Sequence, residues 1–349
     1  GVLIRETEGE ICGECPGGLS GAHIHFPISS VGATENALLA GVTARGETFL
    51  ENCALEPEIM HLCHFLQAMG AEIRGIGTRK IWMRRAAALR DVEYTIPTDR
   101  IVAGTCLYAA AATRGQIGLK DVDPQEMKSV LRVYEKMGGQ WEMRSGTLRA
   151  NAAGIRFPVE QVCTMPYPGF PTDMQSILMS VLLTVPGESR IEERIFEKRF
   201  QIVEELRKMG GRITVTGRQA VVCGGRKLTG TTVCARELRG GAALVVAGLS
   251  AQGESVVKHA EYIERGYAAL KASFVMMYCT ENPQTKQQWE KVHPFFASED
   301  YGFMMENYGH GGRTNPAGEG MGEFTIYDWG NGAAAEAYNR ILDKFGKIE

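Results

Sequence analysis

One pattern of residues occurs four times along the chain and limits the folds that it can adopt. Each copy has an apolar segment that predicts a buried helix, a turn with a glycine, a short strand and an amphipathic helix. The turn glycines of successive copies are Gly46, Gly115, Gly187 and Gly253. Further β-type segments follow the amphipathic helix, so the repeated unit is β-α-β-α-β-β in a mixed α/β (α+β) fold. Because a unit with a fully buried helix cannot close its own core, we expect the units to assemble around these helices.

A second regular feature marks the same register. A methionine-glycine pair ends each of the first three amphipathic segments, at Met69-Gly70, Met137-Gly138 and Met209-Gly210. Glycine after the last helical residue is a common helix C-cap, because it adopts a left-handed conformation without steric cost. We therefore expect three amphipathic helices to end at these pairs.

The repeats divide the chain into regions. Ile96–Gly104 interrupts the pattern with Pro97 and predicts a domain junction, where Asp99 is interpreted as a helix N-cap. We predict a partial first domain over 1–97, containing one unit and the end of another, and a second domain over 98–270 with three units, the last one incomplete. Residues 271–349 lose the repeat and are left unassigned, as a tail that we expect to pack loosely.

Composition excludes several classes of protein. The chain has 349 residues and a net charge of −3, which gives no electrostatic reason to bind nucleic acid. No apolar run approaches 18 residues, so no membrane span is expected. Nine scattered cysteines indicate reduced thiols and a cytoplasmic setting. Cys12 and Cys15 form a lone C-x-x-C with no second pair at zinc spacing, so we predict neither a metal site nor a cofactor.

The stretch Thr164–Phe200 carries the most unusual residues. Three prolines, Pro166, Pro168 and Pro171, predict a rigid, irregular segment that leads to Asp173. The apolar run Met174–Val185 then predicts a buried helix, so that Asp173 lies near its N-terminus. From local features Asp173 is either a helix cap or the carboxylate of an anion-handling site that includes Arg199.

Three arginines lie at element starts or turns of the last two repeats: Arg199, Arg239 and Arg265. Isolated arginines are usually surface residues. Together, however, their planar guanidinium groups suit carboxylate and phosphate, and they form a candidate anion cluster. The turn Ile28–Thr34 precedes a helix and can present backbone N–H groups to an anion, although an ordinary strand-helix turn has the same appearance.

Several motifs together resemble the UDP-N-acetylglucosamine 1-carboxyvinyltransferases, a family of enolpyruvyl transferases. Between Ala22 and Leu270 these motifs are SVGATEN, EPEI, DRI-x-AGT, PYPGFPTDMQ, FEKRF, ELR and ERGY, in the order of the family. The resemblance implies an inverse α/β barrel fold, with three units per domain and substrates bound between two domains. It also implies a cytoplasmic monomer without a cofactor that transfers enolpyruvyl from phosphoenolpyruvate to the 3′-hydroxyl of UDP-N-acetylglucosamine in peptidoglycan synthesis.

The resemblance also implies roles for individual residues. Asp173 matches the carboxylate that takes the sugar hydroxyl proton, and Arg239 is the second residue expected to be catalytic. The other matching positions are expected to bind substrate: Ser30 and Val31 near the uridine diphosphate, Ile195 near the nucleotide sugar, and Arg199 and Arg265 with Arg239 around phosphoenolpyruvate and the departing phosphate. Glu237 is also expected to be a substrate-binding residue.

The chain departs from the family pattern in three positions and in extent. Glu237 and Glu264 stand where the family has Asp, and Val102 stands where relatives carry an acid. Two N-terminal units, including the loop with the general-acid cysteine, have no counterpart, so this polypeptide alone is expected to turn over little substrate. Two alternatives stay open, namely 5-enolpyruvylshikimate-3-phosphate synthase, which shares the fold, and a non-catalytic fragment.

Overall fold

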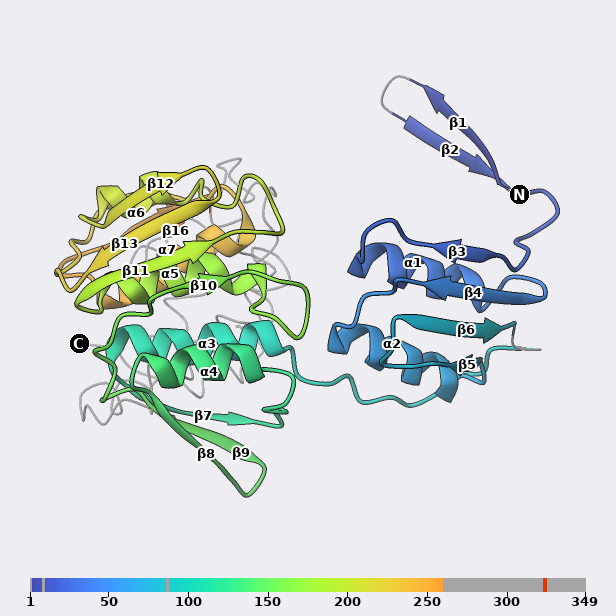
Figure 1. The fold of residues 1–349 in the computed structure, drawn as a ribbon, viewed down its shortest axis with the longest axis horizontal. Coiled ribbons are helices and arrows are strands. Elements are labelled where there is room, and N and C mark those ends of the chain that lie inside the picture. Colours follow the sequence, from blue (N-terminus) through green and yellow to red (C-terminus); the bar gives the residue numbers. More distant parts are fainter. Residues whose placement is uncertain (1, 8–9, 86–87, 260–322, 325–349) are drawn as a thin grey trace, which may run out of the picture. The chain divides into compact units, whose positions relative to one another are not determined.

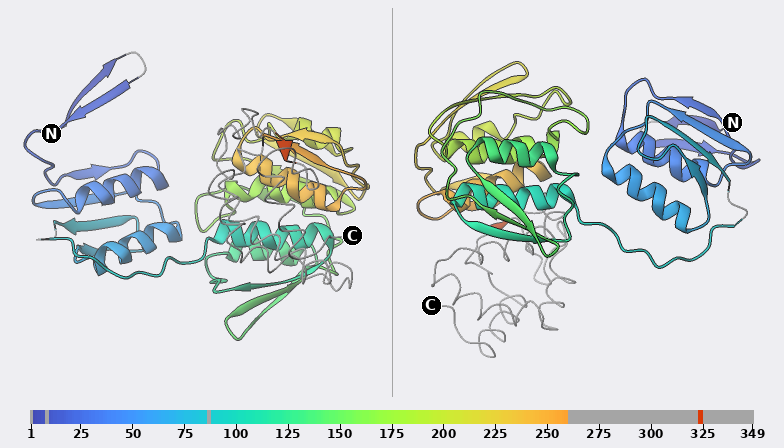
Figure 2. Two further views of the ribbon diagram at one scale, coloured as in Figure 1. Left: turned by 180° about the vertical axis from the view of Figure 1, so that it is seen from behind. Right: turned by 60° about the horizontal axis from the view of Figure 1, so that its bottom comes forward.

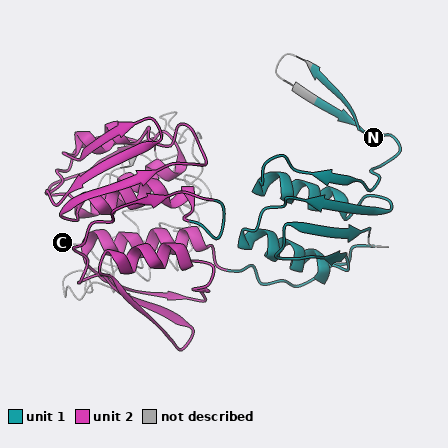
Figure 3. Cartoon of the chain, in the orientation of Figure 1, with its two compact units in different colours: residues 1–97, 166–169 teal, residues 98–165, 170–349 magenta. Residues whose placement is uncertain are grey.

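The computed structural model describes residues 2–7, 10–85, 88–259 and 323–324 (Figure 1). The chain forms two compact units, which are described separately (Figure 3). Unit 1 contains residues 1–97 with 166–169, and unit 2 contains 98–165 with 170–349. The expected tail at 271–349 lies outside the described residues, apart from Glu323–Phe324. No helix in the described part of the chain is both long and apolar enough to cross a bilayer.

Unit 1 is one repeat preceded by a β-hairpin. The hairpin pairs β1 (Leu3–Thr7) with β2 (Glu10–Glu14) in antiparallel register. The repeat has a four-stranded sheet and two helices that cover one of its faces (Figure 2). In sheet order the strands are β3 (His23–His25), β4 (Glu47–Glu51), β6 (Lys80–Arg84) and β5 (Glu72–Arg74), and the helices are α1 (Val31–Gly41) and α2 (Pro57–Ala68). β3 and β4 are parallel and the other pairs antiparallel, as a β-α-β-α-β-β unit requires.

Unit 2 contains the remaining three repeats. The elements of the second repeat are α3 (Arg100–Thr113), β7 (Gln116–Lys120), α4 (Lys128–Lys136), β8 (Gln140–Arg144) and β9 (Thr147–Asn151). The third has β10 (Val162–Cys163), a 3₁₀ turn (Thr172–Met174), α5 (Gln175–Leu183), β11 (Gly187–Glu192), α6 (Val203–Lys208), β12 (Arg212–Thr216) and β13 (Gln219–Gly224). The fourth has β14 (Thr232–Cys234), α7 (Leu238–Ser250), β15 (Val256–Lys258) and β16 (Glu323–Phe324).

The sheets confirm the predicted repeat. The third repeat has the strand order β10-β11-β13-β12, which is the order of unit 1. In the fourth repeat β15 pairs in parallel with β14 and antiparallel with β16, so β16 takes the place that β13 has in the third. The second repeat differs because its first strand is missing among the described residues. There Tyr94 lies against α2, where its hydroxyl donates to the carbonyl of His61 at 3.2 Å.

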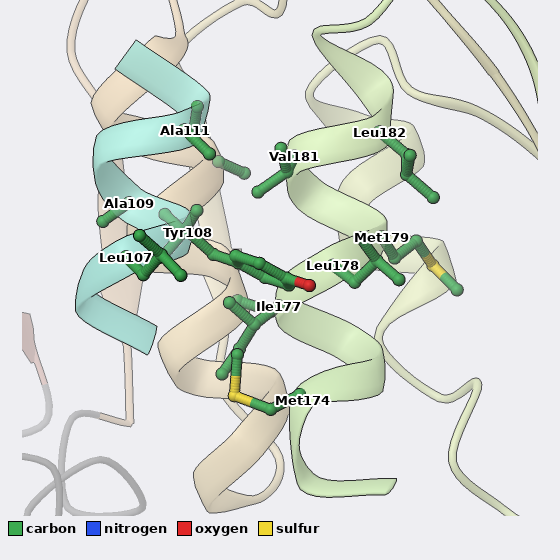
Figure 4. Packing of buried hydrophobic residues seen from close by; sticks show 14 of the residues in the cluster. Leu107, Tyr108, Ala109, Ala111, Met174, Ile177, Leu178, Met179, Val181 and Leu182 are labelled. Atoms are coloured by element: carbon green, nitrogen blue, oxygen red, sulfur yellow. The ribbon is translucent and has the colours of Figure 1, made fainter. Parts of the chain in front are cut away.

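The core of unit 2 lies between its three predicted buried helices. α3, α5 and α7 all contact one another and contribute to one apolar cluster. Figure 4 shows Tyr108 of α3 reaching toward α5, where Leu178 is fully buried. Every residue of α5 is buried, so the prediction of a helix that is apolar on all sides is confirmed for this segment.

The same prediction is wrong for α1. Only Thr34, Leu38 and Gly41 are buried on this helix, and the side chain of Leu39 is 50% exposed. The difference has a packing cause. Unit 1 contains one repeat, so α1 packs on α2 and β4 and has no equivalent helices from other repeats within the unit.

The turn residues also follow the sequence register. Gly70, Gly138 and Gly210 have φ values of 105°, 104° and 89°, which confirms the helix C-caps predicted from the methionine-glycine pairs. The turn between α3 and β7 departs from the pattern. Its residue in the left-handed conformation is Arg114 (φ 59°) and not the predicted turn glycine, Gly115. Its guanidinium group donates to the carbonyls of Ala111 at 2.6 Å and Thr184 at 2.8 Å, and so binds the C-terminal ends of α3 and α5.

Candidate functional site

The candidate site is a group of charged side chains at the N-terminal ends of α5 and α7. Asp173 lies in the 3₁₀ turn that precedes α5, Arg199 follows β11, and Arg239 lies in the first turn of α7. Asp173 Oδ1 accepts a hydrogen bond from Arg199 Nη2 at 3.0 Å and lies 3.3 Å from Arg239 Nε. Asp173 Oδ2 accepts from Arg239 Nη2 at 3.4 Å. Two arginines that are far apart in the sequence therefore meet around the carboxylate of Asp173.

This geometry bears on the interpretation of Asp173 as a helix cap. The helix α5 begins after Met174 and has no side-chain cap at its N-terminus. Asp173 places both carboxylate oxygens against guanidinium groups instead, so the cap interpretation is wrong. Asp99, by contrast, is the cap that the sequence predicts, because its Oδ1 accepts from the backbone N–H groups of Ile101 and Val102 at 2.7 and 3.0 Å.

Glu237 joins the cluster while it caps a helix. Its carboxylate accepts hydrogen bonds from the backbone N–H groups of Arg239 and Gly240 at the start of α7. Glu237 Oε2 also lies 3.7 Å from Arg199 Nη1. Arg199 is covered on a third side by the half-exposed ring of Phe196, 4.7 Å from its guanidinium carbon. A cavity of about 640 Å³ opens beside these groups, lined by Ile195, Phe196, Glu197, Lys198, Arg199, Gln201, Arg218 and Glu237.

Not all predicted site residues belong to this cluster. Ser30 and Val31 lie in unit 1, where Ser30 caps α1 by accepting from Ala33 N at 3.4 Å and Val31 packs against the core. Arg265 and Glu264 lie outside the described residues. Val102 packs partly buried against the core of unit 2. Among the described residues no group of three or more His, Cys, Asp or Glu side chains is arranged to hold a metal ion.

Two buried carboxylates that the sequence does not single out position the cluster. Glu193 is 1% exposed and accepts from Thr172 Oγ1 at 2.9 Å, and from the backbone N–H groups of Ile195 and Phe196 at 2.8 and 2.9 Å. It thereby ties the loop that leads to Arg199 to the residue before Asp173. In the sequence, Glu193 stands out only as a glutamate two residues before Ile195. An exposed glutamate would look the same, so the sequence does not predict this role.

Glu205 on α6 binds the segment that leads to Glu237. Its buried carboxylate accepts from Lys208 Nζ at 2.8 Å and Cys234 N at 3.0 Å, and lies 3.6 Å from Arg236 Nη2. Burial acts to raise the pKa of Glu205, but the hydrogen bonds from Lys208 and Cys234 N, together with the positive charges of Lys208 and Arg236, outweigh it and leave the pKa below its ordinary value. This stabilisation is present above the pKa of the unfolded chain and is lost as the pH falls through the folded pKa.

Substitution of Glu193 tests whether it positions the loop. We expect Glu193→Ala to lower the free energy of unfolding by about 1–3 kcal/mol, because it removes a buried carboxylate that accepts hydrogen bonds from two partly buried N–H groups. The amides of Ile195 and Phe196 should then exchange hydrogen faster. Glu193→Gln keeps an oxygen for both amides and should retain most of the protection. Equal damage in both variants would show that the negative charge, and not the hydrogen bonding, is what the fold requires.

The comparisons with known proteins agree with this fold. The family model described as EPSP synthase (3-phosphoshikimate 1-carboxyvinyltransferase) matches residues 1–273. The chain belongs to the EPSP synthase family, the enolpyruvyl transferases. Solved members of similar fold are the enolpyruvyl transferase NikO from Streptomyces tendae and EPSP synthase from Acinetobacter baumannii. The first has a TM-score of 0.71 at 22% identity, over 78% of this chain and 68% of that one. The second has a TM-score of 0.60 at 20% identity, over 80% and 68%.

Curated relatives in the EPSP synthase family are more similar in sequence. UDP-N-acetylglucosamine 1-carboxyvinyltransferase 2 of Caldanaerobacter subterraneus subsp. tengcongensis is 44% identical over 272 residues, which are 78% of this chain and 65% of the relative. The UDP-N-acetylglucosamine 1-carboxyvinyltransferase of Chlorobium luteolum is 43% identical over 272 residues, 78% of this chain and 64% of the relative. The chain thus spans a little under two thirds of the length of these relatives.

Proposed function

We propose that this chain is part of an enolpyruvyl transferase that acts on phosphoenolpyruvate and UDP-N-acetylglucosamine in peptidoglycan synthesis. The observation that carries the proposal is the carboxylate of Asp173 held between Arg199 and Arg239. A carboxylate can accept a proton from a sugar hydroxyl, and two guanidinium groups can bind the carboxylate and phosphate of phosphoenolpyruvate. The curated relatives named for this reaction support the choice of substrates.

The proposed reaction moves one proton to Asp173 and one to the substrate. The 3′-hydroxyl oxygen attacks C2 of phosphoenolpyruvate and its proton passes to Asp173, while C3 takes a proton from a general acid and a tetrahedral ketal forms. The family resemblance implies that this acid is a loop cysteine, which has no counterpart in this sequence. The conjugate base of that acid then takes a proton back from C3 as the C2–O bond to phosphate breaks, which restores the alkene and releases inorganic phosphate. Arg199 and Arg239 stabilise the negative charge of the phosphate as it departs.

Other residues have proposed binding roles. Ser30 and Val31 in the turn before α1 are proposed to contact the uridine diphosphate, and Ile195 the nucleotide sugar. Glu237 and Arg265 are proposed to complete the set around phosphoenolpyruvate. The position of Glu237 supports its role, because its carboxylate lies 3.7 Å from Arg199 and fixes the first turn of α7, which carries Arg239.

Thermal unfolding with two sugar substrates tests the proposal. At a ligand concentration 100 times Kd, we expect UDP-N-acetylglucosamine to stabilise the chain by about 2.7 kcal/mol and to raise the midpoint by several degrees. Shikimate-3-phosphate should leave the midpoint unchanged. The reverse result would favour the EPSP synthase activity that the description of the matching family model suggests. A midpoint that responds to neither ligand would favour a non-catalytic fragment.

A further inference from the structure

The donors that an anionic substrate needs are already occupied in the free chain. The fork formed by Nε and Nη2 of Arg239 faces the Asp173 carboxylate at 3.3 and 3.4 Å. Nη2 of Arg199 donates to the same carboxylate at 3.0 Å, and its Nη1 faces Glu237 at 3.7 Å. The guanidinium groups of Arg199 and Arg239 are therefore already paired with the carboxylates of Asp173 and Glu237.

The cluster is nevertheless within reach of a ligand. The side chains of Arg199, Arg239 and Asp173 are 19%, 25% and 35% exposed, and the 640 Å³ cavity has Arg199 and Glu237 in its wall. A guanidinium fork binds carboxylate and phosphate with the same planar geometry. An incoming phosphate and the Asp173 carboxylate consequently compete for the same N–H donors.

We propose that Asp173 is an internal competitor that fills the anion site until a phosphate-bearing ligand displaces it. In the free chain Asp173 holds Arg199 and Arg239 together. When the ligand takes over these guanidinium groups, the Asp173 carboxylate loses its charged partners and gains the freedom to accept a proton. Anion binding and release of the base thus become one event.

This exchange deepens the proposed function and rests on it for the identity of the proton donor. If Asp173 takes the proton of a sugar hydroxyl, it becomes available only when phosphoenolpyruvate is in place. This order of events prevents proton transfer before the phosphate is bound. A sugar hydroxyl that binds alone meets a carboxylate that already accepts hydrogen bonds from two guanidinium groups. The exchange of donors itself rests only on the geometry of the free cluster.

The affinity for inorganic phosphate tests the competition. We expect Asp173→Asn to bind phosphate about tenfold more tightly than the unmodified chain, measured by titration calorimetry and by ³¹P line broadening. The amide is nearly isosteric but hydrogen-bonds guanidinium groups more weakly than a carboxylate does, so it yields the donors more readily. Thermal unfolding of each variant checks that the fold is retained.

A charge control separates competition from general repulsion. Glu197→Gln removes one negative charge from the same loop, where Glu197 lies 3.7 Å from Arg218 and, within the described part of the chain, pairs with neither Arg199 nor Arg239. We expect its phosphate affinity to change less than about twofold. An equal gain in both variants, or no gain in Asp173→Asn, would overturn the proposal. Absence of phosphate binding in every variant would overturn the anion site itself, whereas failure of the nucleotide sugar to bind would leave the phosphate result unchanged.

Discussion

Alanine in place of Leu178 is expected to lower the free energy of unfolding of unit 2 by about 3–5 kcal/mol. Leu178 is fully buried in α5, the helix that contacts both α3 and α7. Truncation removes three carbon atoms from the junction of three helices, where the surrounding backbone cannot collapse to fill the cavity. Denaturant unfolding monitored by circular dichroism measures the loss, provided that transitions of the two units are fitted separately.

The matched control is an exposed apolar residue of the same unit. Met143 on β8 is 43% exposed, so Met143→Ala should change the free energy of unfolding by less than about 0.5 kcal/mol. A loss at Leu178 no greater than at Met143 would contradict the central place of α5. It would mean that the three helices are not one cooperative core.

Removing both guanidinium groups of the cluster is expected to reduce the affinity for the proposed substrate phosphoenolpyruvate by about 100- to 10,000-fold. Hydrogen bonds to charged groups each contribute about 1.5–3 kcal/mol, so the Arg199→Met and Arg239→Met double variant loses about 3–6 kcal/mol of binding free energy. Methionine keeps much of the apolar stem and removes every donor. Titration calorimetry at constant ionic strength measures the difference.

Two further variants make this measurement specific. Arg239→Lys keeps the charge without the planar fork, and we expect an intermediate loss of affinity. Arg218→Met removes a half-exposed arginine of the neighbouring turn, whose guanidinium contacts Glu197 and the carbonyl of Arg194. Its affinity should stay within about threefold of the unmodified chain. A loss there as large as in the double variant would indicate a general effect of positive charge.

Much of the fold is predictable because the chain repeats. An element that is clear in one copy of the repeat predicts the same element at the matching position of the other copies. The three methionine-glycine pairs fix the ends of α2, α4 and α6, and left-handed glycines follow all three. The start of α3 is predictable from its N-cap Asp99, and α7 begins in the same way directly after Glu237. The burial of α1 is overestimated because a pattern of apolar residues does not show how many neighbouring helices are present to cover it.

The candidate site is predictable only where a motif carries it. Local sequence cannot decide between a cap and an anion site for Asp173, because the deciding partners are 26 and 66 residues away. Glu193 and Glu205 escape prediction for the same physical reason. From sequence alone, a glutamate on a loop or a helix face is predicted to be solvent-exposed. Only the tertiary structure shows the backbone N–H groups that donate hydrogen bonds to it.

The pairing of β15 with β16 has a consequence for the order in which the chain folds. Between Glu192 and Gln219, the ends of β11 and β13, there are 26 intervening residues, whereas 64 separate Lys258 from Glu323. A contact across a longer sequence separation forms more slowly. In a refolding experiment the amides of β13 should therefore gain protection before those of β16. The fourth repeat would then be the last to close, on a core that the second and third repeats have already built.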